Sequence, residues 1–75
     1  MIRNEGHIKS FGNRIRELRL MKGMTQNDLA DLLNTDRSYI AKIESGKIEI
    51  KLGTIFNLCK AFEITHQELF DFPTK

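Results

Sequence analysis

Apolar residues recur at helical spacing along almost the whole chain, and this pattern constrains its fold more than any other feature. They fall three or four positions apart, as one buried face of a helix requires, and no stretch alternates apolar and polar residues as a half-buried strand would. Glycine, asparagine, threonine and aspartate interrupt the pattern at intervals, and these residues cap and end helices. The sequence therefore predicts an all-α fold of five helices.

The length and cysteine content limit what can stabilise this fold. A chain of 75 residues forms one domain, covering residues 1–75. One cysteine allows no internal disulfide, and with two histidines it makes no zinc-binding set. No apolar run approaches the roughly 18 residues of a membrane span, and the first residues lack a signal-peptide pattern. We expect a cytoplasmic protein without membrane contact, metal or other cofactor.

The first helix is expected to begin between residues 8 and 10 and to end at Lys22. Gly23 can adopt a positive φ and so end the helix. Gly12 lies inside it at a cost of up to about 1 kcal/mol, which a close contact with another helix would explain. Its buried stripe is expected to contain three residues: Phe11, Ile15 and Leu18.

Two shorter helices follow, separated by only two or three residues. A T-x-x-D pattern predicts a capping box between Thr25 and Asp28, and Asn34 suits the left-handed conformation that stops a helix. Asp36 is a good N-cap for the next helix, residues 36–45. The apolar faces are expected to contain Leu29, Leu32 and Leu33 in the first helix, and Ile40 and Ile43 in the second.

Two short helices this close together predict a helix-turn-helix over about residues 25–45. The second helix has a narrow apolar stripe and a wide polar face, a geometry that suits insertion into a polar partner. The charge distribution agrees weakly with double-stranded DNA as that partner. Residues 1–51 carry ten Lys/Arg against seven Asp/Glu, and residues 52–75 carry two against three. A mixed, solvated surface would explain the same bias.

The last third of the chain predicts two more helices. One runs from Leu52 to Phe62, with a glycine in its first turn and no good N-cap. A second capping box, formed by Thr65 and Glu68, opens a short final helix. The fourth helix has apolar residues at core spacing: Leu52, Ile55, Leu58, Cys59 and Phe62. At that position Cys59 is expected to act as a small buried hydrophobe rather than a redox sensor.

Three strings in this order resemble the Cro and phage-repressor type of helix-turn-helix proteins: RIRELR at residues 14–19, GMTQNDLA at 23–30 and RSYIAKIESGK at 37–47. The resemblance covers about residues 11–70. It implies a five-helix, lambda-repressor-like DNA-binding domain. Within the family, residues 37–40 look most like the small controller proteins of restriction–modification systems.

The resemblance also implies which residues contact DNA. The expected base-reading residues are Arg37, Ser38, Lys42 and Gln26. The expected DNA-backbone contacts are Tyr39, Lys47, Thr25, Arg19 and Asn34. Arginine suits bidentate recognition of guanine O6 and N7. Two alternatives stay open: Tyr39 could lean on the edge of the core, and Arg19 matches a family residue that pairs with Glu44 to join the first helix to the third, a structural role that we favour.

Phe56 stands where the pattern of the fourth helix expects a polar residue. We expect Phe56, Ile64 and Phe72 to form one apolar patch that makes an isologous dimer interface. The dimer would hold two recognition helices about one DNA turn apart, roughly 34 Å, on a pseudo-palindrome.

These features predict a sequence-specific transcriptional regulator that binds DNA as a homodimer, with RNA polymerase as a further candidate partner. The alternative is an antitoxin-like or regulatory module that uses the same fold to bind protein. We do not expect an enzyme, because the sequence holds no paired nucleophile and base, acidic dyad or glycine-rich phosphate loop.

Overall fold

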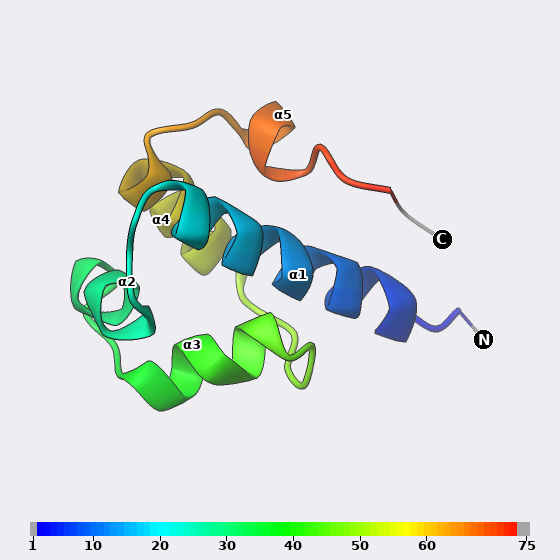
Figure 1. The fold of residues 1–75 in the computed structure, drawn as a ribbon. Coiled ribbons are helices and arrows are strands. Elements are labelled where there is room, and N and C mark those ends of the chain that lie inside the picture. The colour runs from blue at the N-terminus through cyan, green and yellow to red at the C-terminus, as the bar shows by residue number, and fades with distance from the viewer. Residues whose placement is uncertain (1, 74–75) are drawn as a thin grey trace.

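The computed structural model describes residues 2–73, and in this range the chain is helical without strands. The helices are α1 (Glu5–Met21), α2 (Gln26–Leu32), α3 (Arg37–Glu44), α4 (Leu52–Phe62) and α5 (His66–Leu69). The long α1 crosses the molecule, with α3 along one side of it and α5 along the other (Figure 1). α3 packs against both α1 and α2. The expected all-α, five-helix fold is confirmed. No helix among residues 2–73 is long and apolar enough to cross a bilayer.

α1 begins at Glu5, earlier than the start between residues 8 and 10 that the sequence predicted. Its first turn contains no buried residue, so the apolar pattern could not reveal it. The turn is nevertheless regular, with the Ile8 amide donating to the carbonyl of Asn4 over 2.8 Å, and Glu5 is favourably placed near the positive end of the helix dipole. The predicted end is confirmed, since Lys22 is the C-cap and Gly23 has a φ of +70°.

The helix-turn-helix is bounded by side-chain caps at the predicted positions. The Thr25 hydroxyl accepts from the Asp28 amide at 3.0 Å, and the Asp28 carboxylate accepts from the Thr25 amide at 2.8 Å. Asp36 caps α3 by accepting from the Tyr39 amide at 2.9 Å. Asn34 has a φ of +54° between the two helices. The starts of both helices and the turn between them therefore show the local features that the sequence already indicated.

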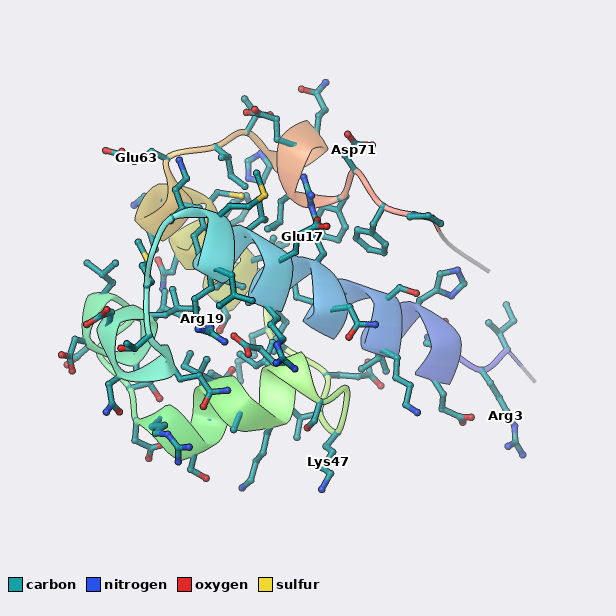
Figure 2. All side chains as sticks on the ribbon, in the orientation of Figure 1. Arg3, Glu17, Arg19, Lys47, Glu63 and Asp71 are labelled. Carbon is teal, nitrogen blue, oxygen red and sulfur yellow. The ribbon has the colours of Figure 1, made fainter. Side chains whose placement is uncertain are left out.

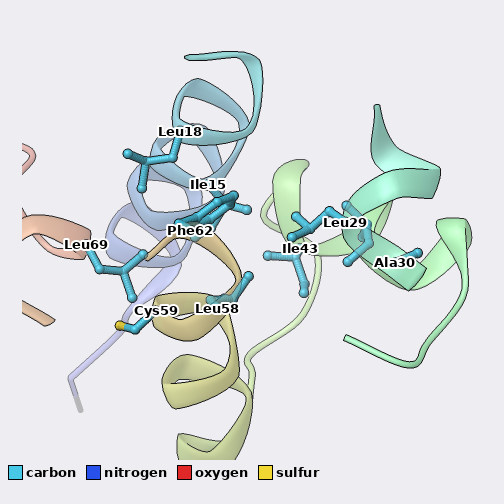
Figure 3. Packing of buried hydrophobic residues seen from close by; sticks show 10 residues of the cluster. Ile15, Leu18, Leu29, Ala30, Ile43, Leu58, Cys59, Phe62 and Leu69 are labelled. Carbon is cyan, nitrogen blue, oxygen red and sulfur yellow. The ribbon is translucent and has the colours of Figure 1, made fainter. Parts of the chain in front are cut away.

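The core lies where α1, α2, α3 and α4 meet, and α5 closes it with Leu69 (Figure 3). The buried apolar residues are Ile15, Leu18, Leu29, Ala30, Ile40, Ile43, Leu58, Cys59, Phe62 and Leu69. Cys59 is buried as predicted, and burial raises the pKa of its thiol. A buried thiol with a raised pKa is a poor nucleophile, which agrees with its expected role as a hydrophobe.

Two predicted core residues are exposed instead. Leu32 is 58% exposed. The buried residues of α2 are Leu29 and Ala30, and Leu32 lies at the edge of the face that they form. Leu52 is 66% exposed. It lies in the first turn of α4, whereas all the buried residues of that helix lie in its second half.

Gly12 lies where α1 crosses α3. A Cβ on this residue would stand 2.8 Å from the carbonyl oxygen of Glu44 and closer still to that of Ile43. The predicted close helix contact is confirmed: the backbone of α1 touches the last turn of α3. This contact fixes how α3 is presented.

Candidate nucleic-acid interface

α3 presents a polar, basic face to solvent. Ile40 and Ile43 are 0% and 2% exposed and anchor the helix, while Arg37, Ser38 and Lys42 are exposed. Ser38 and Lys42 are four positions apart, so they lie on one face. The arrangement leaves two cations and a hydroxyl free to contact a polar ligand.

Tyr39 is half-buried and packs against the hydrophobic core. Of the two alternatives for this residue, contact with the edge of the core is confirmed. A further contact of its ring with DNA is compatible with this position and stays a prediction.

A glycine in the left-handed backbone conformation follows the end of α3. Gly46 has a φ of +72°, and the Lys47 amide donates to the carbonyl of Lys42 over 3.1 Å. Lys47 is exposed and projects from this loop away from α1 (Figure 2).

Gly46 also packs beneath Lys9 of α1: an added Cβ would stand 2.7 Å from Lys9 Cγ. Lys9 is exposed, so a second cation emerges close to the end of α3. Lys9 is not among the site residues predicted from the sequence, because it lies at the uncertain start of the first helix and no local pattern indicates a contact with residue 46.

A buried ion pair joins α1 to α3 behind the exposed face. Arg19 Nε donates to Glu44 Oε2 at 2.7 Å, and Arg19 Nη2 donates to Glu44 Oε1 at 3.1 Å. The two residues are 7% and 8% exposed, and Figure 2 shows Arg19 in the interior between α1, α2 and α3. The hydrogen bond with Glu44 raises the pKa of Arg19 further, against the opposing effect of burial. The predicted pairing of these residues is confirmed.

Arg19 has a third contact, from Nη1 to the carbonyl of Met24 at 2.8 Å. All three guanidinium nitrogens are therefore used inside the protein, which favours the structural role for this residue. Of the other predicted backbone contacts, Thr25 and Asn34 are exposed at the two ends of α2.

Gln26 is linked to the same ion pair. Its Nε2 donates to Glu44 Oε1 at 3.2 Å. Gln26 was predicted to lie at the start of the second helix, but its contact with Glu44 was not predicted. The two residues are far apart in the sequence, and no periodic pattern signals a hydrogen bond between them.

The expected apolar patch on the opposite side is split in two. Phe56 is 42% exposed and lines a hollow together with Ile64, its ring packing edge-on against His66 at 4.9 Å. Phe72 lies in a different hollow with Phe11, at a ring distance of 6.4 Å. The prediction that all three form one patch is wrong, because the chain after α5 turns back along α1 and takes Phe72 with it.

Comparison with known proteins agrees with this geometry. A helix-turn-helix family model matches residues 15–69. The chain is 37% identical over 65 residues to control protein C.BamHI of Bacillus amyloliquefaciens, a match that covers 85% of this chain and 80% of the relative.

Solved structures give the same result. The restriction–modification controller protein C.AhdI from Aeromonas hydrophila matches with a TM-score of 0.85 and 38% identity, over 91% of this chain and 99% of that one. The controller protein C.Esp1396I, solved as a tetramer in complex with its natural 35-base-pair operator, matches with a TM-score of 0.76 and 33% identity, over 85% of this chain and 84% of that one.

Proposed function

This chain belongs to the helix-turn-helix family and is a transcriptional regulator of the controller-protein type, and from that premise we propose that α3 enters the major groove of a pseudo-palindromic operator. The exposed polar face of α3 carries the proposal. Arg37, Ser38 and Lys42 face solvent, while Ile40 and Ile43 hold the opposite side of the helix in the core. A major groove admits one α-helix, and side chains on its outer face then reach the base edges.

The side chains divide by chemistry into base-reading and positioning groups. Arg37 matches the O6 and N7 acceptors of guanine, Ser38 can donate or accept, and Lys42 reaches an acceptor one turn further along. Gln26 approaches from the start of α2. The proposed contacts with the DNA backbone, which set the register without reading sequence, are Lys47, Tyr39, Thr25 and Asn34, with Lys9 added beside Lys47.

A homodimer is the second part of the proposal. Leu52 and Phe56 are four positions apart on α4 and both are exposed, and Ile64 lies beside Phe56 in the same hollow. An isologous contact through these residues would bury them and pair two recognition helices on two half-sites, about 34 Å apart. The operator-bound tetramer of C.Esp1396I supports an oligomeric mode of binding.

The test begins with selection of binding sites from a random DNA pool, which should return a palindrome. Arg37→Ala should then weaken binding to the selected site by about 1–3 kcal/mol and relax specificity at one position of each half-site. Lys22→Ala is the control, because Lys22 is an exposed cation near Glu68 of α5 rather than on α3. It should leave binding to the selected site nearly unchanged.

If no sequence is enriched above non-specific binding, the proposal fails. The alternative of a protein-interaction module would then be favoured, with the exposed Leu52 and Phe56 of α4 as the partner site. RNA polymerase stays a candidate partner, to be tested by adding it to the operator complex.

A further inference from the structure

We propose that the buried Arg19–Glu44 pair is a positioning unit for DNA recognition, which holds the Gln26 side chain in one orientation at the DNA-facing edge of α2. This inference rests on the proposed function, in which Gln26 contacts DNA. It gives the ion pair a role in specificity beyond joining α1 to α3.

Glu44 is the centre of the arrangement. Its Oε1 accepts from both Arg19 Nη2, at 3.1 Å, and Gln26 Nε2, at 3.2 Å, while its Oε2 accepts from Arg19 Nε at 2.7 Å. Glu44 is only 8% exposed, and Gln26 is half-buried. Three helices therefore meet at one carboxylate, which Arg19 holds from α1 and Gln26 approaches from α2.

The chemistry of a carboxylate fixes which way the Gln26 amide points. An ionised carboxylate can only accept hydrogen bonds, whereas a glutamine amide has a donor end and an acceptor end. The NH₂ end of Gln26 must therefore face Glu44, because the reversed amide would set two acceptors against each other. The carbonyl oxygen and the second N–H of Gln26 are left to face away from the pair. A ligand would then meet a fixed donor and acceptor pattern instead of two interchanging ones.

Arg19 makes this use of Glu44 possible. A carboxylate buried near DNA phosphates without a partner would be strongly disfavoured, and the guanidinium compensates its charge. The same guanidinium donates from Nη1 to the carbonyl of Met24 at 2.8 Å, two residues before Gln26. One arginine thus restrains the backbone that enters α2 and, through Glu44, the first side chain of that helix. Such preorganisation reduces the entropy lost when the side chain binds its ligand.

A double-mutant cycle tests the proposal with the selected operator. In one background the ion pair is intact, and in the other R19M/E44L replaces both partners with apolar residues of similar size, a change that folded proteins often tolerate. Gln26→Ala should weaken operator binding about five- to tenfold in the first background, the usual effect of losing one well-placed hydrogen bond. In the second, where Gln26 has lost its acceptor, the loss should be less than about twofold.

An equal loss in both backgrounds would overturn the inference, and so would no loss in the intact protein. A purely structural ion pair predicts the equal loss, since Gln26 would then bind DNA independently of Glu44. Absence of any operator binding by the unmodified chain would instead refute the proposed function. The two failures are therefore distinguishable.

A second measurement uses the free, unmodified chain, so its result does not depend on whether the R19M/E44L variant folds. Gln26 and Gln67 are the two glutamines of the sequence, and Gln67 is exposed on α5. ¹⁵N relaxation of the side-chain amides should give a clearly higher order parameter for Gln26 than for Gln67, whose value should be below about 0.6. Equal order parameters would contradict the proposed positioning of Gln26.

Discussion

At the scale of single residues, the position of α3 depends on the missing side chain of Gly12. The carbonyl oxygens of Ile43 and Glu44 occupy the space that a Cβ would need. Both belong to the last turn of the helix that we propose to enter DNA, so residue 12 sets how closely α1 can support the recognition helix. The glycine is therefore explained by packing and not by a special backbone angle.

Gly12→Ala should destabilise the protein by about 1–3 kcal/mol, because the methyl group can be accommodated only if α3 moves away from α1. Gly53→Ala is the matched control: a Cβ there meets no atom of residues 2–73 within 4 Å, and alanine in the first turn of α4 should stabilise by about 0.5–1 kcal/mol. Urea unfolding followed by circular dichroism measures both. Equal effects of the two substitutions would contradict the packing explanation.

Residue-scale predictions from the sequence succeeded where the cause was local. Exposure of Arg37, Ser38 and Lys42 follows from the spacing of the buried isoleucines along one short helix. The link between Gln26 and Glu44 could not be predicted in this way, since it depends on how α2 is placed against α3.

At the scale of helices, side-chain caps define where the short elements begin. α5 has only four residues, too few to be stable by its own backbone hydrogen bonds. Its capping box supplies two contacts: the Thr65 amide donates to Glu68 Oε1 at 2.9 Å, and the Thr65 hydroxyl accepts from the Glu68 amide at 3.1 Å. The Arg14 side chain also donates to the Glu68 carbonyl at 2.7 Å. Together these contacts hold Leu69 in the core.

The capping box of α5 should make stability depend on pH. Hydrogen bonds to the Glu68 carboxyl group, first from the Thr65 backbone and then from the Thr65 side chain, lower its pKa below the ordinary value of 4.5. The charges of Lys22 and Arg14 lower this pKa by smaller amounts. A carboxyl group whose pKa is lower in the folded state stabilises the fold above its unfolded pKa. This contribution is lost as the pH falls below 4.5 and through the folded pKa.

Urea unfolding at a series of pH values from 6 to 3 measures this effect. The free energy of unfolding of the unmodified chain should fall more steeply below pH 4.5 than that of Glu68→Gln, which has no carboxyl group to protonate at this position. Parallel curves for the two proteins would show that the capping box contributes no pH dependence.

At the scale of the whole molecule, two exposed faces differ in character. The face of α3 is polar and basic, whereas the start of α4 exposes Leu52 and Phe56. Water-exposed leucine and phenylalanine close together are common where another molecule binds. The separation of the two faces would let one chain contact a second copy while it contacts DNA.

Phe56→Glu should shift the monomer–dimer equilibrium towards the monomer by at least about tenfold, since it places a charge in an apolar contact. Sedimentation equilibrium measures the shift. Leu20→Glu is the control, because Leu20 is 57% exposed on α1 and lies outside the proposed interface. Phe56→Glu should also weaken operator binding, because each complex then contains one recognition helix instead of two. Leu20→Glu should not weaken it. A Phe56→Glu protein that sediments as the unmodified chain does would refute the interface.

The helices, their caps and the helix-turn-helix could be predicted from the amino-acid sequence alone. These features depend on hydrogen bonds and apolar spacing between residues within about four positions of each other in the chain. Examples are the capping box of Thr25 with Asp28, the hydrogen bond of Asp36 with the Tyr39 amide, and Gly23 at the end of α1. The pairing of Arg19 with Glu44 was implied by resemblance to a family. The matches with helix-turn-helix proteins confirm the fold that these local features indicated.

Which apolar residues are covered by the core, and which polar groups lie together, depends on how the helices pack against one another. Leu52 is exposed because, among residues 2–73, no other helix covers the first turn of α4, and Phe72 reaches Phe11 because the chain turns back after α5. The hydrogen bond between Gln26 and Glu44 likewise requires α2 and α3 to be packed first. Such contacts join residues that are distant in the chain, and spacing along one helix carries no information about them. The exposed face of α3 was therefore predictable, whereas the buried network that we propose to position Gln26 beside it was not.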